Sequence, residues 1–347
     1  VWINSGATAQ VTWGGLTRGN TYIFFARGQD NNGYWGENSD TQSFKVNGPI
    51  FIENDNFFNP ENGVNGGGDG TEGNPYIIEN WAIDASGAHG IRIQNTTKYF
   101  VIRNCVVENG GSTYNGIYLD NVINGKIENN TCGNNFFGIY LLYSDNNIID
   151  NCILENNDYH GIVFTDSNNN LIQNCISINN HYSGIYLDKP SDNNRVIGCT
   201  VSNDNNYGIW IQSSNNCIIS NNTCENNSEG IRLDYSDNNL VSNNICKGGV
   251  EGIVLTTSDN NILSNNTCGN NMGSIWLNTA SNNTLENNRC ENNIIGIELE
   301  NSNKNNLNNN TCKNGFSYGI YLEENSNNNN LNNNICENNN YGIYVEG

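Results

Sequence analysis

Few side chains in this sequence could do chemistry. It has three histidines, His89, His160 and His181, and the last two lie on successive repeats, in the same region as Asp188. A glycosidase needs two carboxyl groups about 5–10 Å apart, and carboxylates on neighbouring repeats would meet that requirement. Any acidic repeat protein offers such pairs. We therefore expect His160, His181 and Asp188 to be solvated surface residues, and we assign no catalytic residue.

A second group of candidates is aromatic. The repeated unit Gly-Ile-x-Φ, in which Φ is apolar, places residue x on the outward side of a predicted strand, and x is often Tyr or Trp. Such rings beside carboxylates could stack on sugars or bury against another subunit, although Tyr and Trp also simply favour strands. The predicted ligand-binding residues of this stripe are Tyr118, Asp120, Tyr140, Tyr186, Asp188 and Trp210.

The twelve cysteines could form disulfides or bind a metal. Aligned on the repeat, all except Cys217 fall into two inward columns, where they alternate with small core residues. Stacked residues about 4.8 Å apart with parallel side chains do not match disulfide geometry. No CxxC-type spacing occurs, so we predict free buried thiols, no metal site and no cofactor. The Asn run from Asn222 to Asn334 in one column predicts an internal amide ladder.

Composition limits the partners. Lys and Arg total 14 against 35 Asp and Glu, and the net charge of -21 disfavours nucleic acid and anionic lipid. No apolar run is long enough to span a membrane. No signal peptide opens the chain, which begins inside a strand-like segment. Seven sequons are candidates for N-glycosylation, although an Asn-rich chain produces sequons by chance; they lie at Asn95, Asn129, Asn221, Asn226, Asn265, Asn282 and Asn309.

A repeat must position all these residues. The unit Gly-Ile-x-Φ recurs from Gly90 to Gly342, with a spacing of 22–24 residues after the first interval and Ser274 in place of one glycine. The apolar residues alternate, which indicates strands with one buried face, and Asn-Asn pairs between them suit tight corners. Short strands at a fixed period without helices predict a right-handed parallel β-helix of about twelve coils, roughly 55–60 Å long.

The period divides the chain into three parts. Residues 87–347 form the β-helix, and residues 47–86 form a junction that leads into it. Residues 1–46 resemble part of a fibronectin III or Ig-like β module, in the order Leu16 to Tyr22, Asp30 and Trp35, but are too short for a whole sandwich. The last coil has no capping element, so we expect either more chain or another subunit to cover this edge.

The unit Ser-x-Asn-Asn-x-Ile-x-x-Asn-x-Cys-x-x-Asn-x-x-Gly-Ile-x-Leu resembles the PbH1-type repeats of the NosD-like and carbohydrate-binding/sugar-hydrolase families over residues 49–347. The entry segment, Pro49 to Ile52 followed by Gly70 to Trp81, is similar to the start of such domains in archaeal surface proteins. The resemblance implies a copper-maturation protein, a polysaccharide lyase or hydrolase, or a surface-layer or adhesin-like protein. Pectinase-type patterns such as Asp-Asp or Gly-His-Gly are absent, so no catalytic residue is carried over.

These observations favour an extracellular structural or adhesive scaffold at the cell surface, such as a repeating subunit of a surface layer or filament. Its partners would be further copies of itself or other surface proteins, together with polysaccharide on the aromatic and acidic face. The alternative is a β-helical polysaccharide lyase or glycoside hydrolase. Free thiols outside a cell indicate surroundings without oxygen, and with the resemblance they suggest an anaerobic archaeon as the source.

Overall fold

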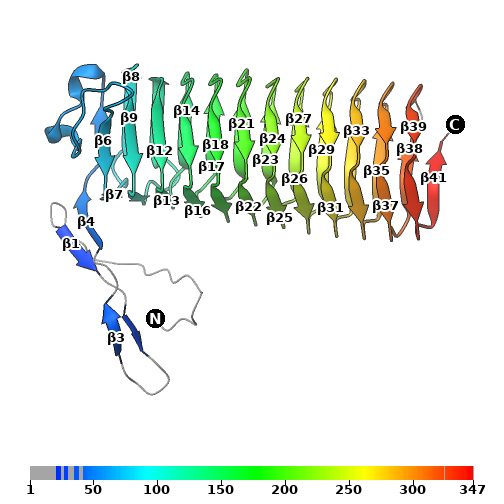
Figure 1. The fold of residues 1–347 in the computed structure, drawn as a ribbon, viewed down its shortest axis with the longest axis horizontal. Coiled ribbons are helices and arrows are strands. Elements are labelled where there is room, and N and C mark those ends of the chain that lie inside the picture. The colour runs from blue at the N-terminus through cyan, green and yellow to red at the C-terminus, as the bar shows by residue number, and fades with distance from the viewer. Residues whose placement is uncertain (1–20, 25–26, 30–34, 39–41, 324, 347) are drawn as a thin grey trace.

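The computed structural model describes residues 21–24, 27–29, 35–38, 42–323 and 325–346. From residue 50 onward the chain winds as a right-handed parallel β-helix, the fold that the repeat predicted (Figure 1). Each coil contributes one strand to each of three sheets, and consecutive coils pair in parallel. The helices of the described residues are two 3-10 turns, Asp55–Phe57 and Pro60–Asn62, and neither could cross a membrane.

The Gly-Ile-x-Φ units, with their outward x positions, belong to the 13-stranded sheet. Its strands are β5 (Ile50–Ile52), β8 (Ile91–Thr96), β11 (Ile117–Val122), β14 (Phe137–Leu142), β17 (His160–Thr165), β20 (Ser183–Asp188), β23 (Tyr207–Gln212), β26 (Glu229–Asp234), β29 (Glu251–Thr256), β32 (Gly273–Asn278), β35 (Ile295–Glu300), β38 (Tyr318–Leu322) and β41 (Tyr341–Val345).

Two further sheets close the coil. The 12-stranded sheet contains β6 (Tyr76–Glu79), β9 (Phe100–Arg103), β12 (Gly125–Glu128), β15 (Ile148–Asp150), β18 (Leu171–Gln173), β21 (Arg195–Ile197), β24 (Ile218–Ser220), β27 (Leu240–Ser242), β30 (Ile262–Ser264), β33 (Thr284–Glu286), β36 (Asn306–Asn308) and β39 (Asn330–Asn332). The 14-stranded sheet contains β1 (Thr21–Phe24), β4 (Gln42–Asn47), β7 (Trp81–Asp84), β10 (Val106–Glu108), β13 (Thr131–Gly133), β16 (Ile153–Glu155), β19 (Ile176–Ile178), β22 (Thr200–Ser202), β25 (Thr223–Glu225), β28 (Ile245–Lys247), β31 (Thr267–Gly269), β34 (Arg289–Glu291), β37 (Thr311–Lys313) and β40 (Ile335–Glu337).

Much of the predicted Ig-like segment 1–46 lies outside the described residues. Within it, β1 pairs antiparallel with β4, and β2 (Arg27–Gln29) pairs antiparallel with β3 (Trp35–Asn38). Strand β4 also pairs in parallel with β7, so it is continuous with the 14-stranded sheet. The predicted junction 47–86 already contributes β5, β6 and β7 to the three sheets, so strands of the solenoid begin before residue 87.

The core follows from the alternation in Gly-Ile-x-Φ. Ile185 and Leu187 of β20 point inward and are fully buried, and most coils repeat this pattern. The glycine before them is required by the close approach of the next coil, because a Cβ on Gly230 would lie 2.6 Å from the carbonyl oxygen of Gly252. Real Cβ atoms do not come so near to a backbone atom, so a side chain here would push two coils apart.

The thiols are free, as predicted, and all except the partly buried Cys336 are buried. The columns are continuous in register, since Cys224 pairs with Cys246 and Cys246 with Cys268. Cys217 lies in a third column that Asn occupies in neighbouring coils. Its N–H donates to Oδ1 of Asn239 at 2.7 Å, as the N–H of the next residue in the column does to Asn261.

The predicted amide ladder is also confirmed. Nδ2 of Asn244 donates to Oδ1 of Asn266 at 3.0 Å and to the carbonyl of Ile219 at 2.9 Å, and its Oδ1 accepts the N–H of Asn222 at 3.0 Å. Each buried amide therefore has hydrogen-bond partners for its own donor and acceptor, and it also bonds backbone groups of both neighbouring coils, as buried polar groups require. The preceding residue, Asn243, has a left-handed φ of 56°, which Asn tolerates at a tight corner.

We predict that Asn266→Ala lowers the free energy of unfolding by about 2–4 kcal/mol, because it leaves buried donors and acceptors of both neighbouring coils without partners. Asn306→Ala, an exposed strand position in the 12-stranded sheet, is the control and should change stability by less than about 0.5 kcal/mol. Urea denaturation followed by circular dichroism measures both. Equal effects of the two substitutions would show that the ladder does not stabilise the coils.

Candidate functional site

Strand pairing places the predicted aromatic stripe in one continuous column. Tyr118 pairs with Tyr140, and Tyr186 pairs with Trp210, each one coil apart on the outward face of the 13-stranded sheet. Asp120 and Asp188 lie two residues further along the same face, in the next column. The sequence period alone was therefore enough to group these residues, because the strands pair without register shifts.

The rings of the stripe stack mainly on one another. The ring centroids of Tyr118 and Tyr140 lie 5.1 Å apart with an interplanar angle of 6°, and those of Tyr186 and Trp210 lie 4.2 Å apart at 15°. The guanidinium of Arg92 lies 5.2 Å from the centroid of Tyr118. At least one face of each of these rings is thus occupied, and that face cannot stack on a sugar.

Two members of the stripe are not exposed, contrary to the expected outward column. Val163 is 3% exposed and Val254 is 0% exposed, although both occupy the outward x position. Each lies between two bulkier residues of the adjacent coils, Tyr140 and Tyr186 in the case of Val163. Larger neighbouring side chains therefore cover the smaller ones, and the face contains small apolar clusters of its own.

The structure does not bring together His160, His181 and Asp188, the weak candidates for catalysis. His160 pairs with Ser183 at the start of β17 and β20, whereas Asp188 pairs with Thr165 at the far ends of these strands. His181 is exposed, and its Nδ1 lies 3.5 Å from Nδ2 of Asn205. The repeat already indicates this separation, because His160 directly precedes Gly161 whereas Asp188 lies four residues after Gly184.

His160 is also not a solvated surface residue, which corrects the expectation from the sequence. It is 2% exposed, and its ring lies 4.4–5.6 Å from the rings of Phe137, Tyr159, Tyr182 and Tyr186. Burial lowers the pKa of His160 to about 3, so the imidazole is neutral. The cluster packs over the outside of the sheet like a second small core.

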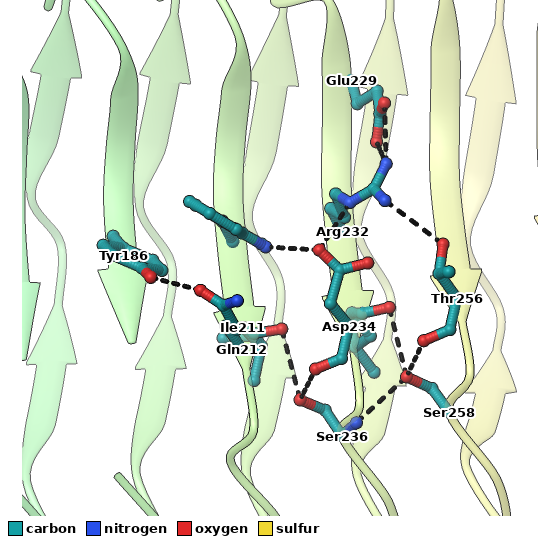
Figure 2. Close-up of polar contacts among 11 residues, drawn as sticks. Tyr186, Ile211, Gln212, Glu229, Arg232, Asp234, Ser236, Thr256 and Ser258 are labelled. Atoms are coloured by element: carbon teal, nitrogen blue, oxygen red, sulfur yellow. Dashed lines mark hydrogen bonds and ion pairs between the residues drawn. The ribbon is translucent and has the colours of Figure 1, made fainter. Parts of the chain in front are cut away.

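Sequence reasoning missed a polar network further along the same face. Arg232 of β26 donates to both carboxylate oxygens of Glu229 at 3.0 Å and to Oδ2 of Asp234 at 2.7 Å (Figure 2). It also reaches Oγ1 of Thr256 at 3.3 Å, and the indole N–H of Trp210 donates to the same Asp234 oxygen at 2.8 Å. The guanidinium is therefore fully engaged by its neighbours.

The next carboxyl group has no such cation. Glu251 pairs in register with Glu229, and its Oε2 is buried against Gly273 without a hydrogen-bond partner. Burial, followed by the charge of Glu229, raises the pKa of Glu251 to about 7. The repeated sequence Glu-Gly-Ile at 229–231 and 251–253 is the signal that could have revealed this pair.

A third acidic group lies two coils beyond. Burial, and then a hydrogen bond with Glu323, raise the pKa of Glu298 to about 8. Glu298 pairs in register with Trp276, whose buried indole N–H has no hydrogen-bond partner. Glu300 lies two residues further along β35 and accepts a hydrogen bond from Asn278 at 2.9 Å. Neutral and ionisable carboxyls thus stand side by side near an aromatic ring.

The structure places all the sequon asparagines at exposed positions. Each has a left-handed φ, between 53° and 58°, at a corner of the coil. They are Asn95, Asn129, Asn221, Asn226, Asn265, Asn282 and Asn309. Their side chains are accessible, and whether they carry glycans stays a prediction.

Comparison with known proteins gives a family and a fold. The family model described as "Periplasmic copper-binding protein (NosD)" matches residues 68–247 and 214–347. No curated protein matches the chain.

Several solved structures share the β-helix. The periplasmic alginate epimerase AlgG is 16% identical, with a TM-score of 0.56 over 88% of this chain and 85% of that one. The mannuronan C-5 epimerase AlgE4 A-module of Azotobacter vinelandii is 12% identical, with a TM-score of 0.55 over 87% and 88%. DFA-IIIase from Arthrobacter chlorophenolicus A6, without its lid, is 10% identical, with a TM-score of 0.53 over 82% and 91%. At these identities the likeness establishes the fold alone.

Copper, which the family description names, does not fit the donors of this chain. Thiolates and imidazoles are the ligands that would hold it, but burial raises the pKa of Cys105 and Cys217 to about 12, so these thiols stay protonated. His160 is enclosed by rings, and Nδ1 of His89 accepts a backbone N–H at 3.0 Å. Across the described part of the chain, no group of three or more His, Cys, Asp or Glu could hold a metal ion.

The carboxyls of this face should make stability depend on pH. A carboxyl whose pKa is raised on folding binds more protons in the folded than in the unfolded state, so stability is lost as pH rises from about 4.5 to the folded value. We therefore expect the midpoint temperature of thermal unfolding to fall as the pH is raised from 5 to about 8. Glu298→Gln should flatten this slope, whereas Glu286→Gln in the 12-stranded sheet should not. An unchanged slope in Glu298→Gln would contradict the raised pKa.

Proposed function

This chain belongs to the NosD family of β-helix proteins, and from that premise we propose that it acts outside the cytoplasm as a rigid, adhesive scaffold at the cell surface, in a surface layer or filament. Its partners in this proposal are other copies of the chain or other surface proteins, held by the outward face of the 13-stranded sheet. The word "periplasmic" in the family description supports a location outside the cytoplasm.

One observation carries the proposal: polar ladders bind the coils to one another along the rod. The amide ladder continues without a break from Asn222 through Asn244, Asn266, Asn288 and Asn310 to Asn334, with amide-to-amide bonds of 3.0 Å. The corner serines add a second series, in which Ser214 N–H donates to Ser236 and Ser236 N–H to Ser258. Such bonding makes a stiff rod that holds surface residues at fixed spacing.

Electron microscopy of the native protein at its source tests this function. We expect ordered filaments or lattices in which neighbouring copies contact one another along the rods. Labelling with an antibody against the chain should place it in these assemblies. Isolated rods with no association with the cell envelope or with other copies would rule out the scaffold.

Cleavage of a polysaccharide is a second candidate, and one arrangement favours it. Glu298, whose pKa is raised to about 8, shares a hydrogen bond with Glu323 and stands beside Glu300 and Trp276, so a carboxyl that keeps its proton lies close to other carboxyls and an aromatic ring. Glycosidic cleavage uses a carboxyl pair of this kind. Two structures with the same fold, AlgG and AlgE4, are named as epimerases of alginate and mannuronan.

We predict that, if this candidate is right, Glu298→Gln lowers the rate of cleavage at least about 100-fold, because it removes the proton donor. Glu286→Gln is the control of equal charge change on another sheet. The measurement is release of reducing ends or of unsaturated products from a panel of uronic-acid and neutral polysaccharides. Absence of products from the whole panel would leave the scaffold as the function.

A further inference from the structure

An exposed apolar ridge runs along one corner of the β-helix, at the turns that precede β29, β32, β35 and β38. It consists of Val250, Met272, Ile294 and Phe316, which are 44%, 54%, 40% and 77% exposed. Backbone bonds place the first three in one column, since the N–H of Met272 donates to Val250 at 2.9 Å and that of Ile294 to Met272 at 2.7 Å. Phe316 lies one residue out of this column, because its N–H donates to Asn293 at 2.9 Å and the N–H of Ser317 donates to Ile294. Large apolar side chains so exposed on successive coils are unusual in a soluble rod and mark a contact surface.

The same corner is built differently nearer the N-terminus. There Phe136, Tyr159 and Tyr182 occupy the equivalent column and stack, with ring centroids 5.7 Å and 4.9 Å apart. Their ring faces are thus occupied by one another, although Tyr159 is still 38% exposed. Asn206 and Ser228 then separate these rings from the apolar ridge. Only beyond this break does the corner expose large unstacked side chains on successive coils.

A hollow of about 590 Å³ adjoins the C-terminal end of the apolar ridge. Ile294, Phe316 and Gly315 line it together with Asn271, Asn292, Asn293, Asn314 and Asn340. It is open to solvent and has room for one or two side chains of a bound segment. The apolar ridge and this hollow thus offer both a strip and a recess for apolar groups.

Carboxyls without cations lie on the same sheet face, along the strands that start at the apolar ridge. Glu251 directly follows Val250, and across the same face lie Glu298, Glu300 and Glu323. The ion pairs of the described residues include none of these four. The guanidinium nearest in register to this group, that of Arg232, already binds Glu229 and Asp234. The surface therefore combines exposed apolar groups with unneutralised acidic ones.

We propose that the apolar ridge and these carboxyls form a docking surface for a basic amphipathic segment of a partner protein. The inference rests on the proposed scaffold function and names the chemistry of its partner. Apolar side chains of the segment cover Met272 and Ile294 and enter the hollow at Phe316, while its Lys or Arg side chains meet Glu251 and Glu298. Charge complementarity selects this partner, since the whole chain carries -21 and the patch has no cation of its own.

Docking has a thermodynamic signature. Glu251 and Glu298 hold protons near neutral pH because they are partly buried and face other carboxyls, Glu229 in the first case and Glu323 in the second. A cation placed beside them favours the ionised form. Binding therefore releases protons, and the heat of binding measured by calorimetry varies with the ionisation enthalpy of the buffer. Non-specific attraction to carboxylates that are already ionised releases none.

The test uses the intact chain and a 14-residue helical peptide of leucine and lysine, with a leucine and glutamate peptide as its control. We expect the basic peptide to bind with proton release at pH 7 and the acidic peptide not to bind. Met272→Ser/Ile294→Ser and Glu251→Gln/Glu298→Gln should each weaken binding at least about tenfold. Ile176→Ser/Ile245→Ser, at exposed apolar positions of the 14-stranded sheet, and Glu61→Gln/Glu72→Gln are matched controls that should not.

Equal binding by the patch variants and their controls, with circular dichroism showing all of them folded, overturns the proposal. The proposal is also overturned if the patch substitutions abolish binding of a polysaccharide but leave peptide binding unchanged. The surface would then bind a glycan and not a protein segment. The scaffold function is judged separately by microscopy. Assemblies that persist with the patch variants would refute the docking surface as their contact and leave the scaffold intact.

Discussion

The parallel pairing of one coil on the next is the constraint on which this structure depends. Every strand from β8 to β38 in the 13-stranded sheet bonds to a strand on each side, so each residue lies against its equivalents in two neighbouring coils. A side chain is therefore acceptable only if it packs or bonds with a copy of its own position. Inward Ile and Leu do so by packing, thiols by their small size, and Asn by donating and accepting at once.

The same constraint acts on the outward face, with a different result for each kind of residue. Stacked rings satisfy one another, as Tyr186 and Trp210 do, and so become less available to a ligand. Carboxyls that are partly buried near other carboxyls, with no guanidinium to neutralise them, have raised pKa values, as Glu251 and Glu298 do; burial is the larger cause and the neighbouring carboxyl the smaller one. In the aromatic half of the face the rings thus pack mainly on one another, whereas in the acidic half the carboxyls lack cations that a partner can supply.

Family, fold and site give different amounts of information about function. The family model establishes membership of the NosD family, and the likeness to epimerases establishes only the β-helix, a fold that serves many chemistries. The donors of this chain do not suit copper, since all its thiols except the partly buried Cys336 are buried and its histidines are separate. The ladders, and the surface that they hold in place, favour instead a scaffold with a docking face.

The sequence by itself determined the coil, its period, the free buried thiols and the amide ladder, because each is a property of one position repeated at a fixed interval. It also grouped Tyr118, Tyr140, Tyr186 and Trp210 in one column. Only the tertiary structure decided what those columns expose. It buried His160 among aromatic rings, buried Val163 between larger rings, and left Glu251 without a cation. These outcomes depend on the size and charge of side chains in the neighbouring coils, some 20 residues away in sequence. A repeat pattern shows which residues are neighbours, but not how their side chains pack or interact.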